Sequence, residues 1–179
     1  MSRAEPEQIR LLSSRLRGGS TQERRDAALR LGRFGEQAVS ELIAALGDSD
    51  TGVRARAAFS LARVGSVASL DALAGRLQDQ QEDPEVRLQA AVAIGRVKHP
   101  RATEALVAAL GDPSEEIRAL ACQGLGNQED SGTARALTPL LEDSSPDVRL
   151  QAAIALAKLS GRPDGTGYER PSQNSRDWS

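Results

Sequence analysis

The sequence predicts an all-α fold, an α-solenoid of about five stacked helical hairpins followed by a tail without regular structure. Two observations carry this prediction. A Val-Arg or Ile-Arg pair recurs every 31 to 33 residues, at positions 53–54, 86–87, 117–118 and 148–149. Apolar residues make up 39% of the chain but aromatic residues only 2%, which suits close helix packing better than a sheet core.

The recurring segment has the spacing of an amphipathic helix. Val86, Ala90, Ile94 and Val97 lie at i, i+4, i+8 and i+11, which places them on one face of a helix. Small residues follow each pair at a fixed offset: Ala57-Ala58, Ala90-Ala91, Ala121-Cys122 and Ala152-Ala153. A further upstream copy has Glu23 in place of the Val. Each copy is therefore interpreted as one buried-face helix.

A second helical segment precedes four of these helices. The segments are 38–46, 68–77, 102–110 and 133–141. Short turns rich in Gly, Asp, Ser and Pro separate the two helices of a unit. Pro139 lies inside the last of these segments, and it should kink or distort the helix because proline lacks the N–H that an α-helix needs.

The repeats define the expected domain organisation. Hairpins are predicted at about 5–35, 36–66, 67–98, 99–129 and 130–161, so that residues 1–161 form one array. A lone hairpin of this size cannot bury its apolar stripe, whereas stacked neighbours can. Residues 162–179 are rich in Gly, Pro, Ser and charge and are predicted to be flexible. Their Tyr168 and Trp178 are candidate anchors that either cap the last repeat or dock on a partner.

The repeat pattern resembles a known family. The pattern Leu-x-Asp, a short turn, Val-Arg, Ala-Ala and Leu-Gly is followed, with substitutions, at 46–65, 110–126 and 141–159. This order is similar to HEAT repeats, in particular the phycobilisome-lyase HEAT-like subtype, over about residues 5–161. The resemblance implies a right-handed superhelix whose first helices face the convex side and whose Val-Arg helices face the concave side. It is specific for fold and nearly silent about function.

The resemblance also implies an internal ladder of Asp–Arg pairs, one within each repeat. The matching pairs are Asp48–Arg54, Asp79–Arg87, Asp112–Arg118 and Asp143–Arg149. Arginine suits such a ladder because its planar guanidinium makes two hydrogen bonds to carboxylate or backbone oxygens. In the first repeat Gly18 stands where the Asp belongs, so Arg24 is expected to lack its usual partner.

The sequence does not favour catalysis, and no cofactor or metal is expected. Deoxyhypusine hydroxylases, a HEAT-like enzyme family, bind iron through paired His-Glu motifs, but the single histidine here, His99, precedes Pro100 and is interpreted as a turn residue. Cys122 is interpreted as a core residue, with a reactive or bilin-touching thiol as the alternative. No nucleophile–base set or phosphate-binding glycine motif is present. A bilin-lyase-like or other enzyme subunit remains the alternative function.

Protein binding is the function that the pattern favours. Ten positions after the Val stand Arg33, Arg63, Arg96, Asn127 and Lys158, which should lie side by side near the ends of the Val-Arg helices. One interpretation is that cations favour helix C-termini; the other is a basic stripe that receives an acidic segment of a partner. Further candidates for this concave face are Arg25, Arg30, Arg56, Phe59 and Leu120. The hypothesis is a non-catalytic scaffold or adaptor.

Charge and composition argue against other classes of function. A net charge of −2 and two phenylalanines in the array do not favour nucleic-acid binding. One cysteine allows no internal disulfide. No apolar run is long enough to span a membrane, and the absence of a secretion-type leader predicts a cytoplasmic location. Residues 1–35 hold eight arginines against four acidic residues, whereas 99–129 hold two against five, which leaves self-association open.

Overall fold

The structure, a computed structural model, describes residues 4–161, and within this range it consists of paired helices. The first helices of the hairpins are α1 (Ala4–Gly18), α3 (Val39–Ala45), α5 (Leu70–Gln78), α7 (Pro100–Ala109) and α9 (Ala134–Leu137). The second helices are α2 (Thr21–Leu31), α4 (Thr51–Val64), α6 (Pro84–Gly95), α8 (Glu115–Gln128) and α10 (Pro146–Ser160). The predicted all-α solenoid of about five hairpins is confirmed. The predicted tail, with Tyr168 and Trp178, lies outside the described residues.

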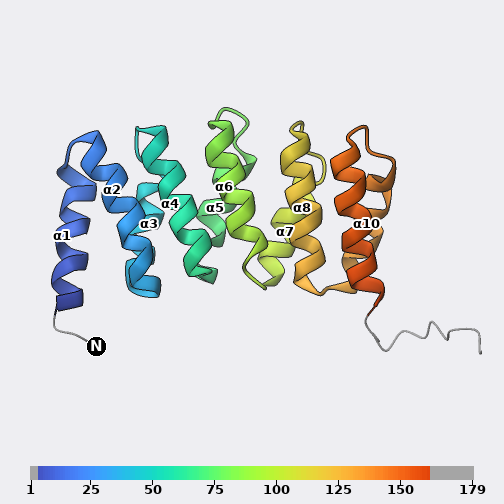
Figure 1. The fold of residues 1–179 in the computed structure, drawn as a ribbon, viewed down its shortest axis with the longest axis horizontal. Helices are drawn as coiled ribbons and strands as arrows, with labels where there is room; N and C mark the ends of the chain where they lie inside the picture. The colour runs from blue at the N-terminus through green and yellow to red at the C-terminus, as the bar shows by residue number, and fades with distance from the viewer. Residues whose placement is uncertain (1–3, 162–179) are drawn as a thin grey trace, which may run out of the picture.

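The helices are arranged in two layers. Figure 1 shows α2, α4, α6, α8 and α10 side by side in front, with α3, α5 and α7 behind them. Contacts between neighbouring second helices are more extensive along the array than contacts between neighbouring first helices. The second helices are therefore the more closely packed layer of the array, and this layer is called the inner layer below.

Side-chain caps begin the second helices. Ser20 and Glu23 form a capping box at α2, in which each side chain accepts a backbone N–H from the other residue. Asp50, Asp83 and Ser114 accept a backbone N–H from the first turn of α4, α6 and α8. These polar residues satisfy N–H groups that have no partner inside the helix. They therefore fix where α2, α4, α6 and α8 start.

The first helix of the fifth hairpin is distorted, as the sequence predicts. Helix α9 is only four residues long and is continued by the 3-10 helix η4 (Thr138–Glu142), which contains Pro139. Three further 3-10 helices, η1 (Gly32–Ala38), η2 (Val67–Ser69) and η3 (Ser131–Thr133), precede first helices. The prediction for Pro139 is confirmed because the proline cannot continue the α-helical hydrogen bonds.

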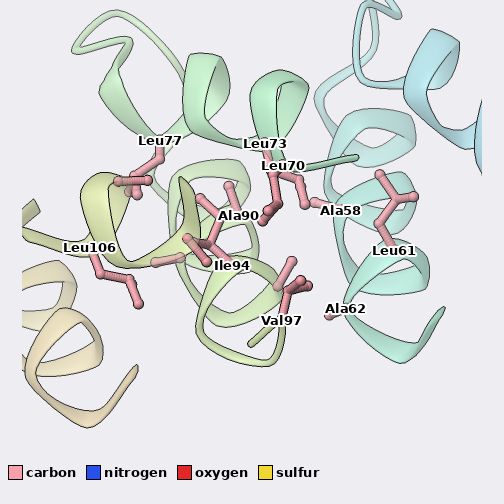
Figure 2. Close-up of a cluster of buried hydrophobic side chains, with 14 of the residues drawn as sticks. Ala58, Leu61, Ala62, Leu70, Leu73, Leu77, Ala90, Ile94, Val97 and Leu106 are labelled. Atoms are coloured by element: carbon pink, nitrogen blue, oxygen red, sulfur yellow. The ribbon is translucent and has the colours of Figure 1, made fainter. Parts of the chain in front are cut away.

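The hydrophobic core runs continuously between the repeats. In Figure 2, Leu61 of α4, Leu70 and Leu73 of α5, Ile94 of α6 and Leu106 of α7 all belong to one buried cluster. Each of these side chains is at most 2% exposed. Because residues from neighbouring repeats fill the same space, each repeat is the packing surface for the next.

Glycine allows the inner helices to approach closely. A Cβ atom on Gly124 would lie 2.9 Å from Leu106 Cδ1 and 3.2 Å from Gly95 Cα. A Cβ atom on Gly126 would lie 2.9 Å from Ala155 Cα. These distances are shorter than ordinary carbon contacts, so a larger residue would push α6, α8 and α10 apart. Among the helices described, none is long and apolar enough to cross a membrane.

Candidate protein-binding face

An arginine ladder connects neighbouring repeats, and it differs from the predicted one. Each arginine binds a carboxylate in the turn of the following repeat, not the carboxylate of its own turn. The pairs are Arg24–Asp48, Arg54–Glu82, Arg87–Asp112 and Arg118–Asp143. Arg118 is typical: Nε and Nη2 each donate to a carboxylate oxygen of Asp143 at 2.8 Å. The predicted pairs Asp48–Arg54, Asp112–Arg118 and Asp143–Arg149 do form, but through the carbonyl oxygen of the aspartate, whereas the pair Asp79–Arg87 does not.

The contact with the arginine's own turn is made through the backbone. Nη1 of Arg54 donates to the carbonyl oxygen of Asp48 at 2.9 Å, and Nη1 of Arg149 donates to that of Asp143 at 2.7 Å. Asp79, predicted as a ladder residue, instead accepts the backbone N–H of Gln81, and Glu82 takes the ladder position. The second helix points each guanidinium across the repeat boundary, which spacing along the chain does not show.

The expectation for Arg24 is wrong for the same reason. Arg24 donates to Asp48 of the second repeat at 2.9 and 3.1 Å, and to the carbonyl oxygen of Gly19 at 3.2 Å. Within residues 4–161 no repeat precedes the first, so Gly18 leaves no arginine of the described ladder without a carboxylate. The open end lies at the last repeat: within residues 4–161, Arg149 has no carboxylate partner.

The ladder shifts the pKa values of its carboxylates. The hydrogen bonds from Arg118 hold the pKa of Asp143 at about 2, below its ordinary value of 3.8. Burial acts to raise the pKa of Asp48 and Glu82, but hydrogen bonds from Arg24 and Arg54 outweigh it, so both pKa values are lowered. These carboxylates are therefore ionised at neutral pH, and their arginines are engaged in the fold.

A second set of cations is free of such partners. It comprises the cationic row, defined here as Arg33, Arg63, Arg96 and Lys158, which are all exposed. No ion pair joins the three arginines to any residue of the described range. Lys158 Nζ donates to Asn127 Oδ1 at 3.0 Å, which shows that residues at this position in successive repeats lie side by side.

Other predicted binding residues differ in how free they are. Arg25 binds both carboxylate oxygens of Asp50 at 2.7 Å, and Arg56 is half-buried and donates to the carbonyl oxygen of Gly52. Arg30, in contrast, is exposed. Arg25 and Arg56 thus stabilise the N-terminal ends of the inner helices and offer little free charge.

An apolar row lies beside the cationic row on the same helices. It comprises Leu29, Phe59, Val92 and Ile154, of which Leu29, Phe59 and Ile154 are 40 to 43% exposed. Leu120, predicted to point away from the core, is half-buried and packs against it. Leu150 is 56% exposed, and sequence reasoning missed it because its neighbours at the same offset are Ala55, Leu88 and Ala119.

A depression between α6 and α8 joins the two rows. Its volume is about 320 Å³, and its lining residues are Ala91, Val92, Gly95, Arg96, Leu120, Gln123, Gly124 and Asn127. The glycines that allow α6 and α8 to approach also leave its floor without side chains. Here an apolar wall, a guanidinium and two amides face one concavity, which can hold a side chain of a bound polypeptide.

An acidic patch that sequence reasoning missed lies on the other half of the inner layer. Glu115, Glu116 and Asp147 line a depression of about 550 Å³ that spans α6, α8 and α10. These residues stand in the first turns of α8 and α10, where the helix dipole favours negative charge. The occurrence of acidic residues in these first turns was the sequence signal that could have revealed the patch. The C-terminal half of the face is therefore acidic at one edge and basic at the other.

The two residues considered for chemistry have structural roles. His99 caps α7, its Nδ1 accepting the N–H of Arg101 at 3.2 Å. Cys122 is fully buried, and burial raises the pKa of its thiol to about 11. Within residues 4–161, no three His, Cys, Asp or Glu side chains are grouped to hold a metal ion.

The chain matches known repeat families. A family model of HEAT repeats matches residues 9–83 and 103–166, and a model of the PBS lyase HEAT-like repeat matches residues 86–112. Deoxyhypusine hydroxylase from Gallus gallus is 29% identical over 153 residues, covering 72% of this chain and 51% of the enzyme. The chain thus spans about half the length of that relative.

Solved structures share the fold. The complex of CpcE and CpcF of phycocyanin lyase from Nostoc sp. PCC7120 contains a chain with a TM-score of 0.72 and 25% identity, over 87% of this chain and 66% of that one. A designed armadillo repeat protein in complex with the peptide (KR)4 has a TM-score of 0.64 and 20% identity, over 87% and 83% of the two chains.

Proposed function

The chain belongs to the HEAT-repeat family, and we propose that it acts as a non-catalytic scaffold whose inner layer binds an acidic, partly apolar segment of another protein. The observation that carries this proposal is the contrast between two sets of arginines. Four ladder arginines bind carboxylates across repeat boundaries, whereas Arg33, Arg63 and Arg96 are exposed with no ion pair among the described residues. The guanidinium groups of these three arginines can therefore donate hydrogen bonds to a bound partner.

The apolar row supplies the second part of the proposed contact. A protein-binding surface typically combines apolar area with arginine, and Phe59 is 43% exposed within one helix turn of Arg63. The depression beside Arg96 offers a place for one larger side chain of the ligand. Charge on the row would set orientation and association rate, and the apolar contacts would add affinity.

The repeat spacing suggests the form of the ligand. Packed helices lie about 8–10 Å apart, and an extended chain advances about 3.3 Å per residue. An extended segment with an acidic residue at every third position would therefore match the cationic row. The armadillo neighbour is bound to a basic peptide; the row here is itself basic, which is why an acidic ligand is proposed.

A fluorescent peptide tests this proposal. The probe is fluorescein-labelled (Asp-Leu-Ser)₄, and the binding variant is Arg33→Glu/Arg63→Glu/Arg96→Glu. We expect the triple variant to bind about tenfold or more weakly in fluorescence anisotropy, because three attractive charges become repulsive. Wild-type chain that does not bind the probe, or binds its Asp→Asn version equally well, would contradict the acidic-segment proposal.

A matched control removes the effect of net charge. Arg10, Arg15 and Arg17 are exposed on α1, away from the inner layer. Their triple change to Glu alters net charge by the same amount and should leave binding of the peptide nearly unchanged. Equal losses in both triple variants would show that only overall charge matters.

An enzyme subunit of bilin-lyase type is the second candidate. The PBS lyase HEAT-like match and the TM-score of 0.72 to a phycocyanin lyase complex favour it. Deoxyhypusine hydroxylase chemistry is not favoured, because the chain has one histidine and so lacks paired His-Glu motifs. Titration of biliverdin with the chain separates the candidates: a saturable absorbance shift at one equivalent supports the lyase type, and an unchanged spectrum supports the scaffold.

A further inference from the structure

The arginine ladder has a direction, and within residues 4–161 it stops at an arginine without a carboxylate partner. At four boundaries the second helix of one repeat supplies the arginine and the turn of the next supplies the acid. Asp48, Asp112 and Asp143 each also accept the backbone N–H two residues on, which orients the carboxylate toward the arginine. In the last repeat Nη1 of Arg149 binds two backbone carbonyls, but no carboxylate of residues 4–161 meets the guanidinium.

The surface around Arg149 has the composition of a repeat interface. Ala153 and Ala157 are exposed, whereas the small residues at the same positions of earlier repeats are almost all buried. Leu141 is 38% exposed, while Leu46 and Leu110 at the corresponding place are 2% and 7% exposed. We call Leu141, Arg149, Ala153 and Ala157 the end face.

The small residues of the end face indicate what shape fits it. At three of the four earlier boundaries a helix of the next repeat crosses close to this position: Gly32 meets Ser60, Gly95 meets Gly124, and Gly126 meets Ala155. The position of Gly32, Gly95 and Gly126 corresponds to Ala157 in the last repeat. A helix with a small residue at its crossing point is therefore the shape that the end face accepts.

A second copy of this chain does not supply that shape. In its first repeat Gly18 replaces the turn carboxylate, and the exposed Arg30 stands where later repeats have Ser60, Ala93, Gly124 and Ala155. Stacking the first repeat of one copy on the end face of another would bring Arg30 against Ala157 and leave Arg149 unpaired. Residues 162–179 contain Pro163, Gly165, Gly167 and Pro171, which are unfavourable in a helix.

We propose that the end face binds a helical hairpin of a different protein, which places an acidic turn residue on Arg149 and a small helix residue against Ala157. The four internal boundaries define both requirements. The bound hairpin would act as one more repeat in the stack. This surface is the end of the stack and differs from the cationic and apolar rows of the inner layer, so the proposal does not depend on the proposed scaffold ligand.

The chain itself can be turned into the probe. Gly18→Asp restores a turn carboxylate, and a Cβ atom on Gly18 has no neighbour within 4 Å. Arg30→Ala removes the exposed charge that blocks the crossing. Adding Ala157→Arg closes the probe's own end face, so that Gly18→Asp/Arg30→Ala/Ala157→Arg can bind wild-type chain without binding itself. Circular dichroism checks that every variant is folded.

Sedimentation velocity then measures the complex. We expect a 1:1 complex of probe and wild-type chain, and about tenfold or more weaker binding when the wild-type partner carries Arg149→Gln. The variant Gly18→Asp/Ala157→Arg, which keeps Arg30, should also fail to bind wild-type chain. No complex between two folded chains would overturn the proposal, as would equal binding to Arg149→Gln.

Two further outcomes would assign the end face to another occupant. Self-association of the wild-type chain that Arg149→Gln abolishes would make a second copy the partner. Binding of the probe that appears only after residues 162–179 are deleted would make that segment the natural cover. Either result overturns the proposal, whereas unchanged binding by the deleted chain supports it.

Discussion

Arg118 and Asp143 face each other across the boundary between the last two repeats, with Nε and Nη2 of the guanidinium each 2.8 Å from a carboxylate oxygen. Both side chains are largely buried, at 14% and 9% exposed. The same arginine also donates to the carbonyl oxygens of its own turn. One side chain thus ties the turn of its own repeat to the turn of the next.

Removing a ladder arginine should cost more stability where the arginine binds a carboxylate than where it binds only backbone carbonyls. Arg118→Gln breaks two charge-assisted hydrogen bonds and leaves Asp143 partly buried without its cation, so we expect a loss of about 2–3 kcal/mol in the free energy of unfolding. Arg149→Gln loses only contacts to backbone carbonyls, and we expect about 1 kcal/mol or less. Urea unfolding followed by circular dichroism measures both. Equal losses would mean that the carboxylate contact adds nothing.

Acid should weaken the array through the same pairs. The pKa of Asp143 is held at about 2 by Arg118, below its ordinary value of 3.8. A lowered folded-state pKa stabilises the fold above the unfolded-state value, and this stabilisation disappears as pH falls from about 4 toward 2. The difference in unfolding free energy between wild type and Asp143→Asn should therefore be largest at neutral pH and shrink below pH 4. A difference that stays constant from pH 7 down to pH 2 would contradict this account.

Gly124 should not tolerate even a methyl group. Gly124→Ala would place Cβ 2.9 Å from Leu106 Cδ1 and 3.2 Å from Gly95 Cα, so overpacking should cost about 1–3 kcal/mol despite alanine's better helix propensity. Gly75 in α5 is the matched control, because its Cβ position has no neighbour within 4 Å. Gly75→Ala should stabilise the chain by up to about 1 kcal/mol. Melting temperatures of Gly124→Ala and Gly75→Ala that both rise, or both fall, relative to wild type would refute this account.

The Cys122 thiol should react only when the fold opens. It is fully buried, and burial raises its pKa to about 11, so little thiolate exists at pH 8. We expect reaction with Ellman's reagent to be at least about a hundredfold slower in the native chain than in urea. Because Cys122 is the only cysteine, the signal needs no further assignment. Rapid native labelling would revive a reactive role for this residue.

The repeat period predicted the fold because the spacing of apolar residues within each hairpin agrees with the way the hairpins stack. The Val-Arg helices, their buried alanines and the distortion at Pro139 all follow from spacing and residue type. The HEAT resemblance is likewise confirmed by the family models. Each of these features depends on positions within one hairpin, which is the scale that sequence spacing describes.

The contacts between repeats could not be predicted in the same way. Arg54 is six residues from Asp48 and 28 from Glu82, and the family resemblance implied a pair with the nearer acid. In the structure Arg54 binds the carboxylate of Glu82 and only the backbone carbonyl of Asp48, because a guanidinium on the second helix extends past the boundary. The half-buried state of Leu120 and the acidic patch around Glu116 likewise depend on how neighbouring helices stack.

The direction of the ladder has a consequence for how such a chain lengthens during evolution. A repeat brings its own acid for the arginine before it and its own arginine for the acid after it, as the fourth repeat does with Asp112 and Arg118. A tandem duplication of that unit would place matching groups at both new junctions without any compensating mutation. Arrays of this type can therefore gain or lose whole repeats in single genetic steps, while the two end repeats change to suit whatever lies beyond them.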